Sequence, residues 1–219
     1  MNRILIALLT AVALLATSAV TVAQKPKPPG KVEVSLKASA NPVKFSIPLV
    51  LTASVKGAQA GQQVKLQRRN VNGSYTDLFT AATNDKGDVA FTQRPAKNTI
   101  YRAITVETTP RASADLLVKV APVVGFTVSD STPTKGALIT FRGTVRPAHD
   151  GRRVAIQRKA ANGTWATVGK PTLRDAGTRF SKYSRRIRIS ATAVFRVVIA
   201  EHADHAAGVS RERTLTVGG

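Results

Sequence analysis

The sequence GQQVKLQRRNVNGSYTDL at residues 61–78 decides the fold, because it returns at residues 151–168 as GRRVAIQRKAANGTWATV. The offset between the copies is constant at 90 residues. A self-match without gaps predicts two copies of one structural unit. The six identical pairs are Gly61/Gly151, Val64/Val154, Gln67/Gln157, Arg68/Arg158, Asn72/Asn162 and Gly73/Gly163.

Each copy of this repeat predicts a β-hairpin. In the second copy the apolar Val154 and Ile156 alternate with outward positions, which is the period of a half-buried strand. Asn-Gly at residues 162–163 is the strongest short turn signal, since both residue types tolerate a positive φ. A large aromatic residue, Tyr75 or Trp165, follows two residues after the glycine. We expect it to fill the core across the hairpin, with stacking on carbohydrate as the alternative.

Similar alternation continues on both sides of the repeat. It predicts about seven short strands per unit, with turns about every 8–12 residues and no helix, which is typical of an all-β sandwich with Greek-key connections. The two units are residues 31–122 and 123–219, and a turn is expected at residues 174–177. Outside the hairpins the expected strands are residues 32–36, 49–55, 88–93, 99–106, 114–120, 125–128, 138–145, 178–181, 194–200 and 211–217.

Further matches extend the pairing beyond the repeat. Tyr101-Arg102 corresponds to Phe195-Arg196, and Ser113 corresponds to Ser210. Together with the GxxVx[LI]QR start and the Asn-Gly turn followed by Tyr or Trp, the pattern resembles the immunoglobulin-like repeats of secreted and cell-wall proteins from high-GC Gram-positive bacteria. The resemblance implies two tandem immunoglobulin-like (Greek-key) β-sandwich domains after a signal peptide. It implies no single function, because such modules serve as spacers, adhesion units and accessory domains alike.

The amino terminus predicts export. Arg3 precedes a mostly apolar run at residues 4–16, and Thr-Val-Ala at residues 21–23 fits a small-x-small cleavage site. Residues 1–23 are therefore expected to be a signal peptide, and residues 24–30, QKPKPPG, a Pro/Lys linker. The apolar run is short for a membrane span, which needs about 20 residues, so an uncleaved anchor is only the alternative. We expect a secreted, extracellular protein, either free or associated with the cell envelope by non-covalent contacts, that has no transmembrane anchor after signal cleavage.

The net charge is the most unusual bulk property. The chain has 33 Lys and Arg residues against 12 Asp and Glu residues, which gives a formal net charge of +21, and it has no cysteine. Such a charge favours a polyanionic partner, here an anionic cell-wall polymer or an acidic glycan. The alternative is a diffuse charge that serves solubility alone. The absence of cysteine excludes disulfides and thiolate metal sites.

The densest basic cluster is RFSKYSRRIRI at residues 179–189. In an extended segment Arg186 and Arg188 share one face, while Ile187 and Ile189 point inward. Such a row can bind phosphates, sulfates or uronates through charge-assisted hydrogen bonds. The alternative is a solvated strand face whose charges prevent edge pairing. The predicted polyanion-binding residues are Arg179, Lys182, Arg185, Arg186 and Arg188.

Few residues suggest catalysis or metal binding. The three histidines are His149, His202 and His205, and the last two lie in EHADH at residues 201–205. Their spacing matches no defined zinc pattern, so we expect a solvated polar loop there, with no metal and no cofactor. The sequence has no GxSxG turn, no phosphate-binding glycine loop and no motif for specific nucleic-acid binding. We therefore expect no catalytic residues and no enzyme, with a hydrolase that uses His202 and His205 as a minor alternative.

These observations together predict an exported, non-catalytic structural or adhesive module that associates with anionic cell-envelope or extracellular polymers. The rival hypothesis is an accessory or inhibitor protein that docks on a partner protein through strand edges or loops. Salt separates the two hypotheses, because polyanion binding weakens steeply with ionic strength, whereas apolar docking does not.

Overall fold

The computed structural model describes residues 32–58 and 60–218. The regular elements in this part of the chain are all β-strands, as the all-β prediction requires. Within the same residues, no helix has the length and apolar character that crossing a bilayer requires. The predicted signal peptide at residues 1–23 and the predicted linker at residues 24–30 lie outside the described residues.

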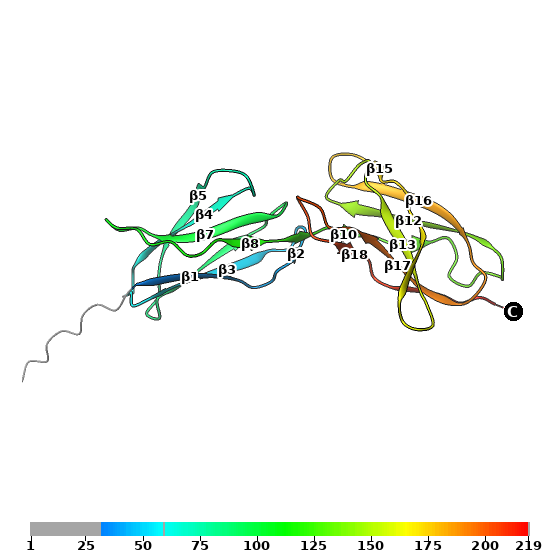
Figure 1. The fold of residues 1–219 in the computed structure, drawn as a ribbon, viewed down its shortest axis with the longest axis horizontal. Helices are drawn as coiled ribbons and strands as arrows, with labels where there is room; N and C mark the ends of the chain where they lie inside the picture. The colour runs from blue at the N-terminus through cyan, green and yellow to red at the C-terminus, as the bar shows by residue number, and fades with distance from the viewer. Residues whose placement is uncertain (1–31, 59, 219) are drawn as a thin grey trace, which may run out of the picture. The chain divides into compact units, whose positions relative to one another are not determined.

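Residues 33–121, called the first half below, form two antiparallel sheets and one short parallel pair (Figure 1). One sheet has the order β1-β3-β6, with bounds Glu33–Ala38, Leu49–Lys56 and Asp88–Gln93. The other has the order β5-β4-β7-β8, with bounds Thr76–Ala82, Gln63–Arg69, Thr99–Thr105 and Leu116–Val118. The parallel pair joins β2 (Val43–Lys44) to β9 (Val120–Ala121).

Residues 123–215, called the second half below, form two further antiparallel sheets. The first has the order β10-β12-β16-β15, with bounds Val123–Val124, Leu138–Arg146, Ser181–Arg188 and Arg174–Asp175. The second has the order β14-β13-β17-β18, with bounds Trp165–Gly169, Val154–Lys159, Ala193–Ile199 and Gly208–Val209. Two short strands also pair with central ones: β11 (Thr127–Val128) with β12, and β19 (Arg213–Leu215) with β17.

The repeat has the predicted structure in both halves. It forms a hairpin, β4–β5 or β13–β14, whose first strand also pairs with β7 or β17. Its first residue, Gly61 or Gly151, has a φ of 86° or 78°, which explains why glycine stands at both positions. At the tip, Gly73 donates a backbone hydrogen bond to Asn70, and Gly163 donates one to Ala160. The hairpin prediction is confirmed in both copies.

Each half has its own hydrophobic core. Leu51 on β3 packs in one cluster with Leu66 on β4 and Tyr101 on β7, so the inner faces of the two sheets meet. In the other cluster the ring of Phe141 on β12 meets the edge of Phe195 on β17, with centroids 5.1 Å apart. Burial alternates along β3 and β7 with the two-residue period of strands. Full burial of one such side chain stabilises the fold by about 1.5–3 kcal/mol.

The aromatic residues of the repeat lie outside the two cores, so the prediction that they fill them is wrong. Tyr75 and Trp165 are partly exposed. The guanidinium carbon of Arg102 lies 3.6 Å from the centre of the Tyr75 ring, and that of Arg196 lies 4.1 Å from the Trp165 ring. The aromatic residue that precedes each arginine is buried instead, because successive strand residues face opposite sides of the sheet.

The segment between β14 and β16 also differs from the prediction. A strand was expected at residues 178–181, but residues 178–179 form a turn and β16 begins at Ser181. The strand begins there because Ser181 is fully buried and its hydroxyl accepts a hydrogen bond from the backbone of His149 at 2.6 Å. The expected turn at residues 174–177 contains β15, which pairs with β16.

Candidate anion-binding surface

Strand β16 carries four of the five predicted basic residues, and its inner face is fixed by Tyr183. The Tyr183 ring is buried and its hydroxyl donates a hydrogen bond to the carbonyl of Gly125 at 2.8 Å. Burial raises the pKa of Tyr183 far above its usual range, so the hydroxyl keeps its proton. Beside it, a Cβ on Gly143 would lie 2.0 Å from the Gly125 oxygen. Only glycine therefore lets these three segments meet.

The outer face of β16 is basic. Lys182, Arg186 and Arg188 are exposed, whereas Ile187 is partly buried and packs against the core. The prediction that Arg186 and Arg188 share a face opposite Ile187 is confirmed. The Arg188 guanidinium also donates a hydrogen bond to the carbonyl of Gly136 at 2.7 Å, which holds the end of the row in place.

Neighbouring strands add positive charge to this face. Lys182 lies directly opposite Arg174 on β15, and Ser184 lies directly opposite Arg142 on β12. Residues directly opposite each other share a face, and like charges in that position repel. Among the salt bridges that the described residues form, none involves Arg142, Arg174 or Lys182. The repulsion between Lys182 and Arg174 is therefore not offset by a salt bridge, and a bound anion would relieve it.

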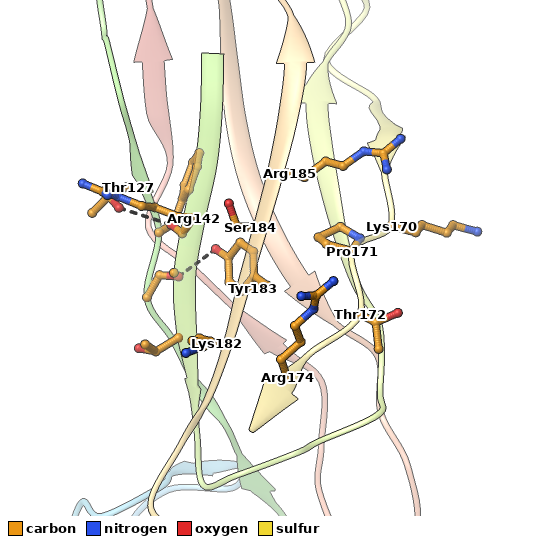
Figure 2. A pocket seen from close by; sticks show the side chains of 14 residues that line it. Thr127, Arg142, Lys170, Pro171, Thr172, Arg174, Lys182, Tyr183, Ser184 and Arg185 are labelled. Carbon is orange, nitrogen blue, oxygen red and sulfur yellow. Dashed lines mark hydrogen bonds between the residues drawn. The ribbon is translucent and has the colours of Figure 1, made fainter. Parts of the chain in front are cut away.

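A hollow of about 850 Å³ lies at the same place (Figure 2). Among the residues of the described chain that line it, none is acidic. Figure 2 shows Lys170, Arg174 and Arg185 to the right of β16 and Arg142 to the left of β12. The basic lining residues are Arg142, Lys170, Arg174, Lys182 and Arg185.

The structure divides the five predicted residues into three groups. Lys182 and Arg185 line the hollow, and Arg186 and Arg188 continue along β16 beyond its lining. Arg179 lies in the turn before β16 and does not line the hollow. All five side chains are exposed.

Three basic residues of the hollow were missed by sequence reasoning: Arg142, Lys170 and Arg174. Arg142 lies on a strand that was predicted, and its outward position follows from the two-residue period, so the sequence contained a signal for it. Lys170 and Arg174 come from the segment after β14, which was expected to be a loop and a turn. Nothing in their local sequence points to β16.

The loop at residues 201–205 is only partly the solvated loop that the sequence predicts: Glu201, Ala203 and Asp204 are exposed, but His205 is buried. The exposed fraction of His205 is 7%, and that of His149, which packs beside it, is 6%. Burial lowers the pKa of His202 and of His205. The positive charge of Arg152 lowers that of His202 further, whereas the hydrogen bond to the carbonyl of Ala96 opposes the effect of burial on His205. The lowered pKa favours the neutral form of the His202 and His205 rings.

Comparisons with known proteins identify no family. No family model matches the chain, and the comparison with curated proteins found no match. Among solved structures the chain is similar to bovine butyrophilin, with 13% identity over 85% of this chain and 99% of that one and a TM-score of 0.44. It is also similar to a tetra-tandem repeat in the extending region of a large adhesion protein, with 13% identity, 85% and 49% coverage and a TM-score of 0.36. At such low similarity, the function has to be argued from the basic surface itself.

Proposed function

We propose that the protein is an exported, non-catalytic module that acts as a structural or adhesive unit on anionic polymers of the cell envelope or the extracellular space. The observation that carries the proposal is the hollow of about 850 Å³, whose charged lining residues are all basic. It lies on the strand whose sequence predicts polyanion binding. The ligand class is a polymer with repeated phosphate, sulfate or carboxylate groups.

The basic surface suits a polymer better than a single small anion. Alternate residues of a strand are about 6.6 Å apart, so the exposed row from Lys182 to Arg188 on β16 extends over about 20 Å. Arg174 and Arg142 widen the row on either side through the cross-strand register. An arginine guanidinium can donate two hydrogen bonds to two oxygens of one phosphate or carboxylate. Successive anionic groups along a polymer would then bind to successive basic side chains of the row.

The proposed architecture is two tandem immunoglobulin-like sandwiches at residues 31–122 and 123–219. Separate sheets and separate hydrophobic cores in the two halves support it, as does the repeat in equivalent hairpins. Export follows from the leader-like sequence at residues 1–23. A secreted module of this kind meets anionic polymers outside the cell, which fits the basic surface.

The alternative function, docking on a partner protein by strand addition, is favoured by one different feature. Strand β5 lies at the edge of its sheet, and its residues are exposed or only partly buried on both faces. Phe79 in the middle of β5 has an exposed fraction of 55%. An edge strand with a free apolar side chain can accept a strand from another protein.

The salt concentration that elutes the protein from a heparin column tests the polyanion proposal. The triple variant Arg174→Ser/Lys182→Ser/Arg185→Ser removes three charges from the hollow. The matched control Lys37→Ser/Lys44→Ser/Lys86→Ser removes three exposed charges from the first half. We expect the hollow variant to elute at clearly lower salt than the control, because binding depends on local cation density.

Equal elution of the two triple variants would show that the charge acts diffusely, and the proposed surface would be wrong. Docking by strand addition predicts a different pattern. Binding to a protein partner would persist at high salt and would weaken with Phe79→Lys, while the hollow variant would leave it unchanged.

A further inference from the structure

The chain has three histidines, and all of them meet in the second half. His149 lies in the loop after β12, and His202 and His205 lie in the loop between β17 and β18. Their ring centres are 4.7 to 5.2 Å apart in all three pairs. Each ring offers one nitrogen, and these nitrogens lie within 4.8 Å of one another. None of the three residues lines the hollow of the basic surface, so the cluster is a separate feature.

The backbone places His202 and His205 side by side. The N–H of His202 donates to the carbonyl of His205 at 2.9 Å, and the N–H of His205 donates to the carbonyl of His202 at 3.1 Å. This reciprocal pair is an isolated antiparallel bridge across a two-residue turn. Residues opposite each other in such a pair project their side chains to the same side. The imidazole rings of His202 and His205 therefore project to the same side of the turn.

His149 is held in place from another loop. Its backbone N–H donates to the hydroxyl of Ser181 at 2.6 Å, and that hydroxyl donates to a carboxylate oxygen of Asp150 at 2.5 Å. Its carbonyl accepts a hydrogen bond from the N–H of Arg152 at 3.1 Å, which closes the turn. Ser181 is fully buried, so the anchor is part of the packed interior. The third imidazole is therefore as firmly positioned as the other two.

Backbone carbonyls fix the proton position on two of the rings. Nδ1 of His149 lies 2.7 Å from the carbonyl oxygen of Pro147, and Nε2 of His205 lies 2.9 Å from that of Ala96. A carbonyl oxygen only accepts hydrogen bonds, so these nitrogens carry the protons. The lone pairs then lie on Nε2 of His149 and Nδ1 of His205. Metal-binding histidines are held in this way, with the second nitrogen donating to a carbonyl or carboxylate.

One nitrogen on each ring is buried and has no hydrogen-bond partner among the described residues. These atoms are Nε2 of His149, Nε2 of His202 and Nδ1 of His205. Buried polar atoms without a partner are costly and rare, and three in one cluster call for an explanation. An ion bound among them would give all three a partner. On His202, Nδ1 accepts a long contact of 3.4 Å from the N–H of Asp204. Ligation through Nε2 requires the proton of the neutral ring to move to Nδ1, so this weak contact is lost when the metal binds.

We propose that His149, His202 and His205 bind one divalent transition-metal ion, of which Zn²⁺ is the representative. Neutral imidazoles suit Zn²⁺, Cu²⁺ and Ni²⁺, whereas Ca²⁺ and Mg²⁺ require oxygen ligands. Three histidines leave a fourth position of a tetrahedral ion for water or an external ligand. His202 is the most exposed of the three rings and supplies the route of entry. The site does not depend on polyanion binding.

The observed spacing requires a modest closure around the ion. With Zn–N bonds of about 2.0–2.1 Å, the nitrogens of a tetrahedral site lie about 3.4 Å apart. The separations of up to 4.8 Å therefore shorten when the metal binds. Closure ties the loop of His149 to the loop of His202 and His205, so the ion stabilises the folded protein over the unfolded one.

Titration calorimetry with ZnCl₂ tests the proposal, using the purified protein treated with a chelator and carrying a tag without histidine. We expect one Zn²⁺ per chain and a rise in melting temperature. His202→Ala is the first variant, because its ring is the least buried and donates to no carbonyl among its hydrogen bonds. It should weaken Zn²⁺ binding at least about tenfold and reduce the thermal shift accordingly. The matched control is His202→Cys, which restores a ligand atom and should restore binding.

The proposal is overturned if the wild-type protein does not bind Zn²⁺, or if His202→Ala binds it as tightly as the wild type. X-ray absorption of the Zn²⁺-loaded wild-type protein provides a measurement that needs no variant to fold. Three imidazole nitrogens at about 2.0–2.1 Å from the metal would support the site. A spectrum with fewer than three imidazoles would overturn it.

Discussion

Each half forms the same internal hydrogen bonds at equivalent positions. The buried hydroxyl of Ser113 accepts a hydrogen bond from the backbone of Ala103 at 3.0 Å, and that of Ser210 accepts one from Val197 at 2.9 Å. The repeat's glutamines behave in the same way, because each accepts a hydrogen bond from the arginine that stacks on the repeat's aromatic ring. The residues that the halves have in common are those that hold the sandwich together.

The two halves differ in whether their charged surface residues form salt bridges. In the first half Lys65 pairs with Asp77 at 2.7 Å, and Arg69 pairs with Asp115 at 2.9 Å. Lys65 lowers the pKa of Asp77, and a hydrogen bond from Tyr75, followed by one from Arg69, lowers that of Asp115. Among the described residues of the second half, no salt bridge joins two of its own side chains. Arg188, Arg196 and Arg213 donate hydrogen bonds within this half, whereas Arg142, Arg174 and Lys182 form no salt bridge among the described residues.

The difference is concentrated at one position in the fold. Strand β6 pairs with the long strand β3, and β16 pairs with the long strand β12. The sequence of β6 is DVAFTQ, with no basic residue, whereas that of β16 is SKYSRRIR, with four. Equivalent strands thus share their place in the sheet but not their outer face. A binding surface can be added to such a fold without changing its core.

The largest expected effect tests the shared cores. Phe195→Ala should lower the free energy of unfolding by about 3–5 kcal/mol, because it leaves a cavity against Phe141. Tyr101→Ala at the equivalent position should cost a comparable amount. Urea denaturation measures both, with Phe79→Ala, whose ring is 55% exposed, as a control within about 0.5 kcal/mol of the wild type. A loss below about 1 kcal/mol at either core position would contradict the packing described.

A smaller effect tests the shared serines. Ser113→Ala and Ser210→Ala should each lower the free energy of unfolding by about 1–3 kcal/mol, since each leaves a buried backbone N–H without its acceptor. The same denaturation measurement applies, with the exposed Ser184→Ala as the matched control. If one serine proved dispensable and the other did not, the two halves would not be equivalent in their internal bonding.

Much of this internal equivalence could be predicted from the sequence. Strand alternation located the hairpins, and identity between copies marked Gly61 and Gly151, which share a positive φ, and the glutamines that accept the same hydrogen bond in both halves. The burial of Tyr75 and Trp165 was misjudged because an aromatic residue on a sheet can lie under an arginine as well as in the core. Which face it takes depends on the register of the neighbouring strand.

The two candidate sites were less predictable for a related reason. A strand pattern shows which residues face outward, but it does not name the residue on the next strand. The pairing of Lys182 with Arg174 therefore could not be read from either segment. The approach of His149 to His202 depends on loops of two different sheets. Sequence separation between such residues is large, and no local pattern marks their meeting.

The stacked arginines allow a finer comparison of the halves. Arg196→Met should lower the free energy of unfolding by about 0.5–1 kcal/mol, because it removes the cation from the face of Trp165. A double-mutant cycle with Trp165→Leu isolates this contact from the lost packing. Arg102→Met with Tyr75→Leu repeats the cycle in the first half. A coupling free energy of zero in both cycles would mean that the stacking of arginine on the aromatic ring does not stabilise either half.

The smallest effect concerns charge. Arg174→Ser should raise the melting temperature slightly at low salt, because it relieves repulsion with Lys182. Lys65→Ser should lower it slightly, since it breaks an ion pair. Both shifts should vanish near 1 M salt, where the screening length is about 3 Å. Melting-temperature shifts of the same sign for both variants would show that the two halves do not differ in how their surface charges interact.

Trp165 is the single tryptophan of the chain, and it lies on the second half beneath Arg196. Selective excitation of its indole therefore reports on that half alone, whereas the first half contains only the weaker tyrosine fluorophores Tyr75 and Tyr101. The protein thus carries a built-in optical probe. The emission of one unmodified side chain can reveal whether the second half opens before, with or after the rest of the molecule.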